Sequence, residues 1–106
     1  MNAVILNEGL HLAMAWGEDW LKPIQARLAK LHPELSAEEL EAYNTVCQEA
    51  MRLGCEQAKR YTAIATAEEH TTNLESFKSQ IRQHHPWASD DNLSRLFSQG
   101  IYYALK

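Results

Sequence analysis

Apolar residues recur along most of this chain at alternating spacings of three and four residues. That spacing is the period of one face of an α-helix. The segments with this pattern are Leu10–Leu31, Leu40–Ala65, Leu74–His84 and Leu93–Ala104. No window alternates apolar and polar residues as a half-buried strand does. The pattern therefore predicts an all-α protein.

Two copies of the motif His-Pro-x-x-Ser, at residues 32–36 and 85–89, divide this helical pattern. Proline cannot continue a helix, and it pushes the residue before it toward an extended backbone. The serine can then accept hydrogen bonds from the first N–H groups of a new helix. In the first copy Ser36 and Glu39 form a complete capping box, and in the second copy two acidic residues follow the serine. Each motif predicts a turn between two helices.

These turns predict a four- or five-helix bundle built from two antiparallel helical hairpins, forming a single helical domain over residues 1–106. We expect the first helix to end near Gly17 and a break near Glu18 and Asp19. Asp19 would then cap a second piece, with Pro23 close to its first turn. The alternative is one long helix kinked at Pro23. The unbroken apolar face favours nearly collinear pieces in either case.

The longest helix is predicted from Ser36 to about Tyr61. Small residues on its apolar face, at positions 50, 54 and 58, would let another helix approach closely. The next helix could begin at Thr66 or at Thr72, because a capping box starts at each. The last helix is predicted to begin after Ser89.

Composition narrows the function classes. The formal net charge of the 106 residues is −4, which argues against a general nucleic-acid binder because such proteins neutralise phosphates. The residues that would start a DNA-recognition helix are also acidic, in the segments 37–39 and 90–92. The N-terminus lacks the features of a signal peptide, and no apolar run reaches the length of a membrane span. We expect no membrane association.

The two cysteines, Cys47 and Cys55, fall within one predicted helix. Their Cα atoms would be about 12 Å apart, whereas a disulfide needs about 7 Å or less. Reduced thiols and a cytoplasmic location follow as predictions. Cys47 lies on the apolar face and is expected in the core. Cys55 lies off that face near Arg52 and Lys59, as a more exposed thiol.

Candidate catalytic and metal sites are few. Glu8 and His11 have the i, i+3 spacing used in carboxylate-bridged metal bundles, but the second Glu-x-x-His that such sites need is missing. The histidines before the two prolines are better explained by favourable placement at helix C-termini. We therefore predict no enzyme activity, no catalytic residues, no metal and no cofactor.

Aromatic residues give the candidate binding surface. Trp16 and Trp20 share a helical face if the helix is continuous there, and Trp87 lies in the second turn. Tyr102 and its neighbour Tyr103 cannot both face one core. Tryptophan and tyrosine are favoured at interfaces, although large aromatics also fill the core of a small bundle. The candidate protein-binding surface consists of Trp16, Glu18, Asp19, Trp20, Trp87 and Tyr102.

The sequence thus predicts a small, acidic, cytosolic, non-enzymatic protein–protein interaction module. Long apolar faces in so short a chain also predict self-association as a homodimer, which would bury the exposed part of those faces. One alternative is a helical bundle that binds a metal or a small molecule. The other is a nucleic-acid-binding regulator.

Overall fold

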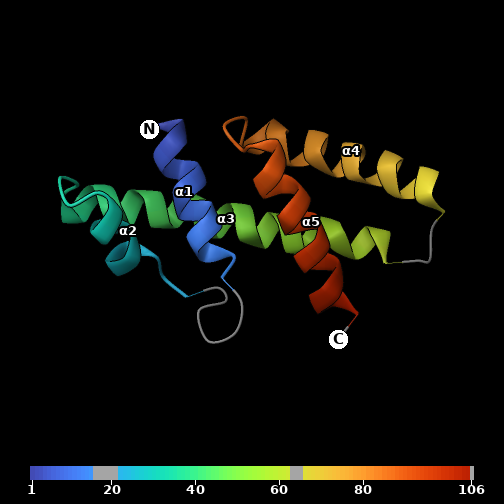
Figure 1. The fold of residues 1–106 in the computed structure, drawn as a ribbon, viewed down its shortest axis with the longest axis horizontal. Coiled ribbons are helices and arrows are strands. Elements are labelled where there is room, and N and C mark those ends of the chain that lie inside the picture. The colour runs from blue at the N-terminus through green and yellow to red at the C-terminus, as the bar shows by residue number, and fades with distance from the viewer. Residues whose placement is uncertain (16–21, 63–65, 106) are drawn as a thin grey trace. The chain divides into compact units, whose positions relative to one another are not determined.

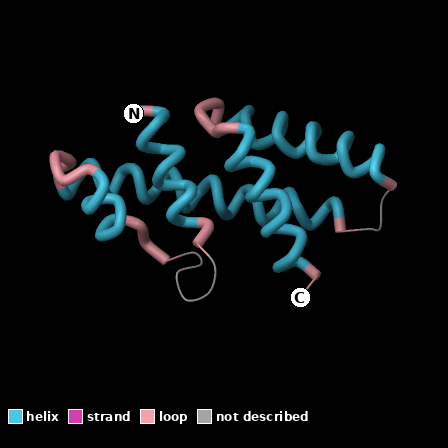
Figure 2. Tube along the Cα trace, in the orientation of Figure 1, coloured by secondary structure: helices cyan, strands magenta, loops and turns pink. Residues whose placement is uncertain are grey.

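The computed structural model describes residues 1–15, 22–62 and 66–105, and these form helices joined by turns, with no strand (Figures 1 and 2). The all-α fold class, with two helical hairpins, is confirmed, and five α-helices lie within these described ranges. The elements are α1 (Ala3–Ala13), α2 (Gln25–Leu31), α3 (Ala37–Ala58), the 3-10 helix η2 (Lys59–Tyr61), α4 (Ala67–His84) and α5 (Asp90–Ala104).

The chain divides into two compact units, Met1–Met51 and Arg52–Lys106. Unit 1 holds α1, α2 and the first part of α3, and unit 2 holds the rest of α3 with η2, α4 and α5. The prediction of a single domain stays a prediction.

Capping residues set the starts of α3 and α5 as predicted, and α4 begins at one of the two positions predicted for it. The Ser36 backbone N–H donates to Glu39 Oε1 at 3.0 Å, and the Glu39 N–H donates to Ser36 Oγ at 3.1 Å. The same reciprocal pair joins Thr66 and Glu69, so α4 begins at Thr66 rather than at Thr72. Ser89 caps α5 by accepting from the Asn92 N–H. These bonds satisfy donors that have no partner inside the helix.

In unit 1, α1 and α2 pack against each other through buried side chains, among them Leu10 and Leu28. The Arg27 guanidinium also donates to the Leu12 carbonyl, at 2.8 Å, in the last turn of α1. The prediction of nearly collinear pieces is therefore wrong, because one continuous apolar pattern serves two helices that fold back on each other. A single helix kinked at Pro23 is also wrong, since α2 begins only at Gln25.

Helix α1 ends at Ala13, before the predicted end near Gly17. Its last carbonyls are satisfied early, because the Met14 N–H bonds back into the turn and Arg27 donates to Leu12. The predicted break at Glu18 and the predicted cap at Asp19 lie outside the described residues.

In unit 2, the core is formed by apolar side chains of α4 and α5, with Phe97 at its centre. The Phe97 ring lies 5.0 Å from Phe77 and 5.6 Å from Tyr61, measured between ring centroids. A Cβ added at Gly100 would lie 2.6 Å from the Cβ of Ala58, and one at Gly54 would lie 2.5 Å from Leu96. The predicted close approach is confirmed at positions 54 and 58 of α3, with α5 as the neighbour.

Candidate functional site

The predicted aromatic surface is only partly within the described residues. Trp16, Glu18, Asp19 and Trp20 lie outside them. The other two members, Trp87 and Tyr102, belong to unit 2, one before the start of α5 and one in its last turn. The 12 steps from Asp90 to Tyr102 span about 18 Å along the helix. These two aromatic residues therefore do not form one patch.

Trp87 is half-buried in the turn between α4 and α5. The ring of His85, from the same turn, meets it edge to face with centroids 5.6 Å apart. This histidine is itself 7% exposed, and its backbone N–H bonds to the Ile81 carbonyl as the C-cap of α4. A residue of the same motif thus covers part of the tryptophan.

The end of α5 exposes two large apolar side chains of unit 2. Tyr102 is 51% exposed, and Leu105, the C-cap residue of α5, is 65% exposed. A spacing of three residues places them on the same side of the helix. The Tyr103 ring packs edge to face on Tyr102, with centroids 5.2 Å apart, and is half-buried. Tyr102 was predicted as part of a binding surface but Leu105 was not, because a leucine at a helix end carries no sign of its exposure.

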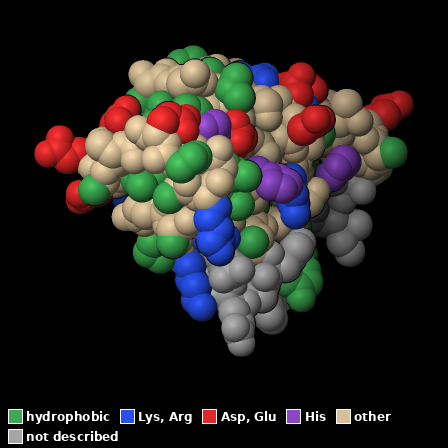
Figure 3. Space-filling model, turned by 60° about the vertical axis from the view of Figure 1, so that its left-hand side comes forward, with side chains coloured by type: hydrophobic (Ala, Val, Ile, Leu, Met, Phe, Trp, Pro, Cys, Tyr) green, Lys and Arg blue, Asp and Glu red, His purple; other side chains and the backbone are tan. Residues whose placement is uncertain are grey.

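Unit 1 exposes apolar side chains as well. Met1 and Val4, at the start of α1, are each 67% exposed, and Leu31 is exposed at the end of α2. On the face seen in Figure 3, hydrophobic side chains lie in small groups between acidic and other polar side chains. Met1 and Val4 lie outside the predicted apolar face. Leu31 is the last residue of that face, so its exposure differs from the prediction.

A charged cluster in unit 1 joins Glu8, His32 and Glu34. Glu8 Oε2 lies 3.0 Å from His32 Nε2, and Glu34 Oε1 lies 3.2 Å from His32 Nδ1. The hydrogen bond with Glu8 is the main reason that the pKa of His32 is raised, and Glu34 adds to it. Glu8, which was considered with His11 as a metal-ligand pair and set aside, thus pairs with His32.

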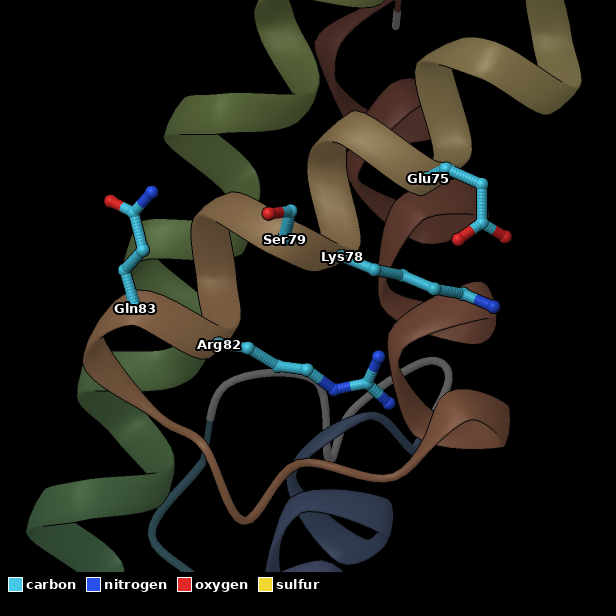
Figure 4. A pocket seen from close by; sticks show the side chains of 5 residues that line it. All are labelled: Glu75, Lys78, Ser79, Arg82 and Gln83. Atoms are coloured by element: carbon cyan, nitrogen blue, oxygen red, sulfur yellow. The ribbon is translucent and has the colours of Figure 1, made fainter.

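A shallow depression of about 370 Å³ lies along α4 in unit 2 (Figure 4). It is lined by Glu75, Lys78, Ser79, Arg82 and Gln83. Figure 4 shows Lys78 and Arg82 extending on one side of α4, while Gln83 points to the other side.

The charges of this depression offset one another. Asp90 Oδ1 lies 2.6 Å from Arg82 Nη2 and 3.7 Å from Lys78 Nζ. Glu75 supplies a second carboxylate on the rim, so two negative groups accompany the two cations. Arg82 also donates through Nε and Nη2 to the Ala88 carbonyl, both at 3.2 Å. The arrangement stabilises the turn before α5 and has no excess of positive charge to select an anion.

Both cysteines are free thiols, and their environments reduce their reactivity. Cys47 is buried, as predicted, and its Sγ donates to the Leu6 carbonyl at 3.4 Å. Burial raises the pKa of Cys47 to about 12. Burial also raises the pKa of the half-buried Cys55, despite the nearby Lys59. Neither thiol has the electropositive, accessible setting of a catalytic cysteine.

Across the described ranges, no three or more His, Cys, Asp or Glu side chains are grouped so that they could hold a metal ion. In the same part of the chain, no helix combines the length and the apolar character needed to cross a membrane. The chain matches no family model, no curated protein and no solved structure.

Proposed function

We propose that this chain is a non-enzymatic protein–protein interaction module that self-associates through the end of α5. The observation that carries the proposal is the exposure of Tyr102 and Leu105, on one side of one helix end. An aromatic and an aliphatic side chain at such exposure gain free energy when a partner removes them from water. Tyrosine is also among the residues that dominate binding energies at interfaces.

A second copy of the chain is the partner that this surface suits. In a two-fold dimer the same patch occurs on both copies, so it must be complementary to itself. Two antiparallel α5 ends would place Tyr102 of one copy against Leu105 of its partner. Both side chains are uncharged, so no like charges would meet at the centre of the contact.

The cysteines support a non-enzymatic role in a reducing, cytoplasmic setting. Thiols with raised pKa values are mostly protonated at neutral pH and are poor nucleophiles. Free cysteines are typical of proteins in reducing compartments.

Sedimentation velocity over a range of protein concentrations tests this proposal. We expect a concentration-dependent dimer for the native chain. The variants Tyr102→Glu and Leu105→Glu should each weaken dimerisation at least about tenfold, or about 1.4 kcal/mol, because a carboxylate would be buried at the contact. Ser76→Glu introduces the same charge at an exposed position of α4 and should have no effect. A native chain that stays monomeric at its highest soluble concentration would disprove the proposal.

A further inference from the structure

Each ring nitrogen of His32 faces a carboxylate oxygen, and the two carboxylates come from different elements. Glu8 belongs to the middle of α1, and Glu34 belongs to the turn between α2 and α3. His32 itself is the C-cap of α2, and its backbone N–H bonds to the Leu28 carbonyl. The imidazole therefore joins α1 to the turn at the end of α2.

The chemistry of this arrangement depends on the protonation state of the ring. A carboxylate can only accept hydrogen bonds, and a neutral imidazole has a single N–H to donate. In the neutral ring the second nitrogen would direct its lone pair at a carboxylate oxygen, which is repulsive. Both contacts are favourable together only when the ring is an imidazolium with two N–H donors.

We propose that His32 is a proton-dependent anchor for α1, which binds the carboxylates of α1 and of the α2–α3 turn together when the imidazole is protonated and can donate to only one of them when it is neutral. This device lies within unit 1 and does not depend on the proposed contact at the end of α5. Within the described residues, Glu8 of α1 and Glu34 of the turn are the charged groups that act on His32. Both are negative, and both therefore favour the charged ring.

Other contacts hold both ends of α1 in place when the His32 contact is lost. The Asn2 N–H donates to Tyr43 Oη at 3.1 Å near the start of α1, and Arg27 donates to Leu12 near its end. Leu6 and Leu10 are buried between these two points. Loss of the His32 contact should therefore increase the local opening of the middle of α1, rather than detach the whole helix.

The direction of the pH dependence follows from the raised pKa of His32. The His32 contacts contribute fully to stability below pH 6.5, the ordinary pKa of histidine. This contribution is lost as the pH rises through the higher folded-state pKa. Because the cluster is partly exposed to solvent, we expect a change of at most about fivefold in the opening equilibrium.

The test combines two measurements on the full chain. An NMR titration of the histidine ring protons should give a pKa above 6.5 for His32, and Glu34→Gln should lower it. Amide hydrogen exchange, corrected for the intrinsic pH dependence of exchange, should show that α1 loses protection as the pH rises through this pKa. The variant His32→Gln should remove that dependence, whereas His84→Gln, at an exposed histidine of α4, should keep it.

Since Glu34 is exposed, Glu34→Gln keeps the test decisive even if His32→Gln fails to fold. The proposal is overturned by a His32 pKa at or below 6.5, by an unchanged pKa in Glu34→Gln, or by α1 protection that does not vary with pH.

Discussion

The two His-Pro turns have nearly the same backbone and different side-chain contacts. The φ and ψ angles are −133° and 72° at His32 and −134° and 70° at His85. In each turn the N–H three residues later donates to the histidine carbonyl at 3.1 Å, and a serine then caps the next helix. The shared residues of the motif account for this shared backbone, because they act locally.

The differences arise at positions where the two copies diverge. The first turn has Glu34 where the second has Trp87. In the helices before the turns, α2 has Ala29 where α4 has Arg82. The first turn is therefore held by a carboxylate pairing with its histidine, and the second by an arginine that donates to the Ala88 carbonyl. A local motif can set the course of the backbone while other residues decide what stabilises it.

The largest expected effect comes from adding a methyl group at a close helix contact, and each unit offers one such contact. In unit 2 the added methyl of Gly100→Ala would meet the Cβ of Ala58, which cannot rotate away from the backbone. Such overpacking costs about 1–3 kcal/mol, against about 1 kcal/mol gained by replacing glycine in a helix. We expect a net loss of up to about 2 kcal/mol in the free energy of unfolding, measured by urea denaturation.

Gly9→Ala is the matched variant in unit 1. Its methyl would lie 2.9 Å from Cys47 Sγ and 2.9 Å from Ile24 Cδ1, which are the ends of side chains and can shift. We expect a smaller loss than for Gly100→Ala. A larger loss for Gly9→Ala than for Gly100→Ala would show that the α1 contact is the more rigid of the two.

A smaller effect is expected from the arginine that distinguishes the second turn. Arg82→Met keeps much of the side-chain stem but removes the hydrogen bonds to Ala88 and the ion pair with Asp90. The loss should be about 1 kcal/mol in the free energy of unfolding, the usual value for a partly buried hydrogen bond. Gln83→Met, at the exposed neighbouring position, is the control and should change stability little. Equal stability of the two variants would show that Arg82 does not hold the turn.

The smallest effect is a pH dependence of the second turn, opposite in direction to that of the first. The hydrogen bond from Arg82, with the charge of Lys78, lowers the pKa of Asp90 below 3.8. The contribution of ionised Asp90 to stability is present above its unfolded-state pKa and is lost as the pH falls through its folded-state pKa. The difference in Tm between the native chain and Asp90→Asn should therefore shrink as the pH falls toward that pKa.

Asp91→Asn is the control for this measurement, since it removes a neighbouring exposed carboxylate of the same helix turn. It should reproduce only the part of the pH dependence that comes from the helix dipole. If both variants behave alike, the pairing of Asp90 with Arg82 adds nothing to stability.

Much of the fold could be predicted because its signals are local. The apolar spacing, the capping box at Ser36 and the cap at Ser89 identified α3 and α5 close to their observed starts, while α4 begins at one of the two positions that the sequence left open. The burial of Cys47 followed from the same spacing. The sequence predicted a break between the first two helices but not the reversal of direction there, because one apolar pattern is compatible both with collinear helices and with helices that fold back on each other.

What the sequence by itself determined is the helical class, the two turns and the core face of each long helix, since these depend on residues within a few positions of one another. The tertiary structure alone decided the pairing of Glu8 with His32 across 24 positions and the close approach of Gly100 to Ala58. It also decided the exposure of Leu105. These features depend on which helix faces lie together, and no local spacing specifies that.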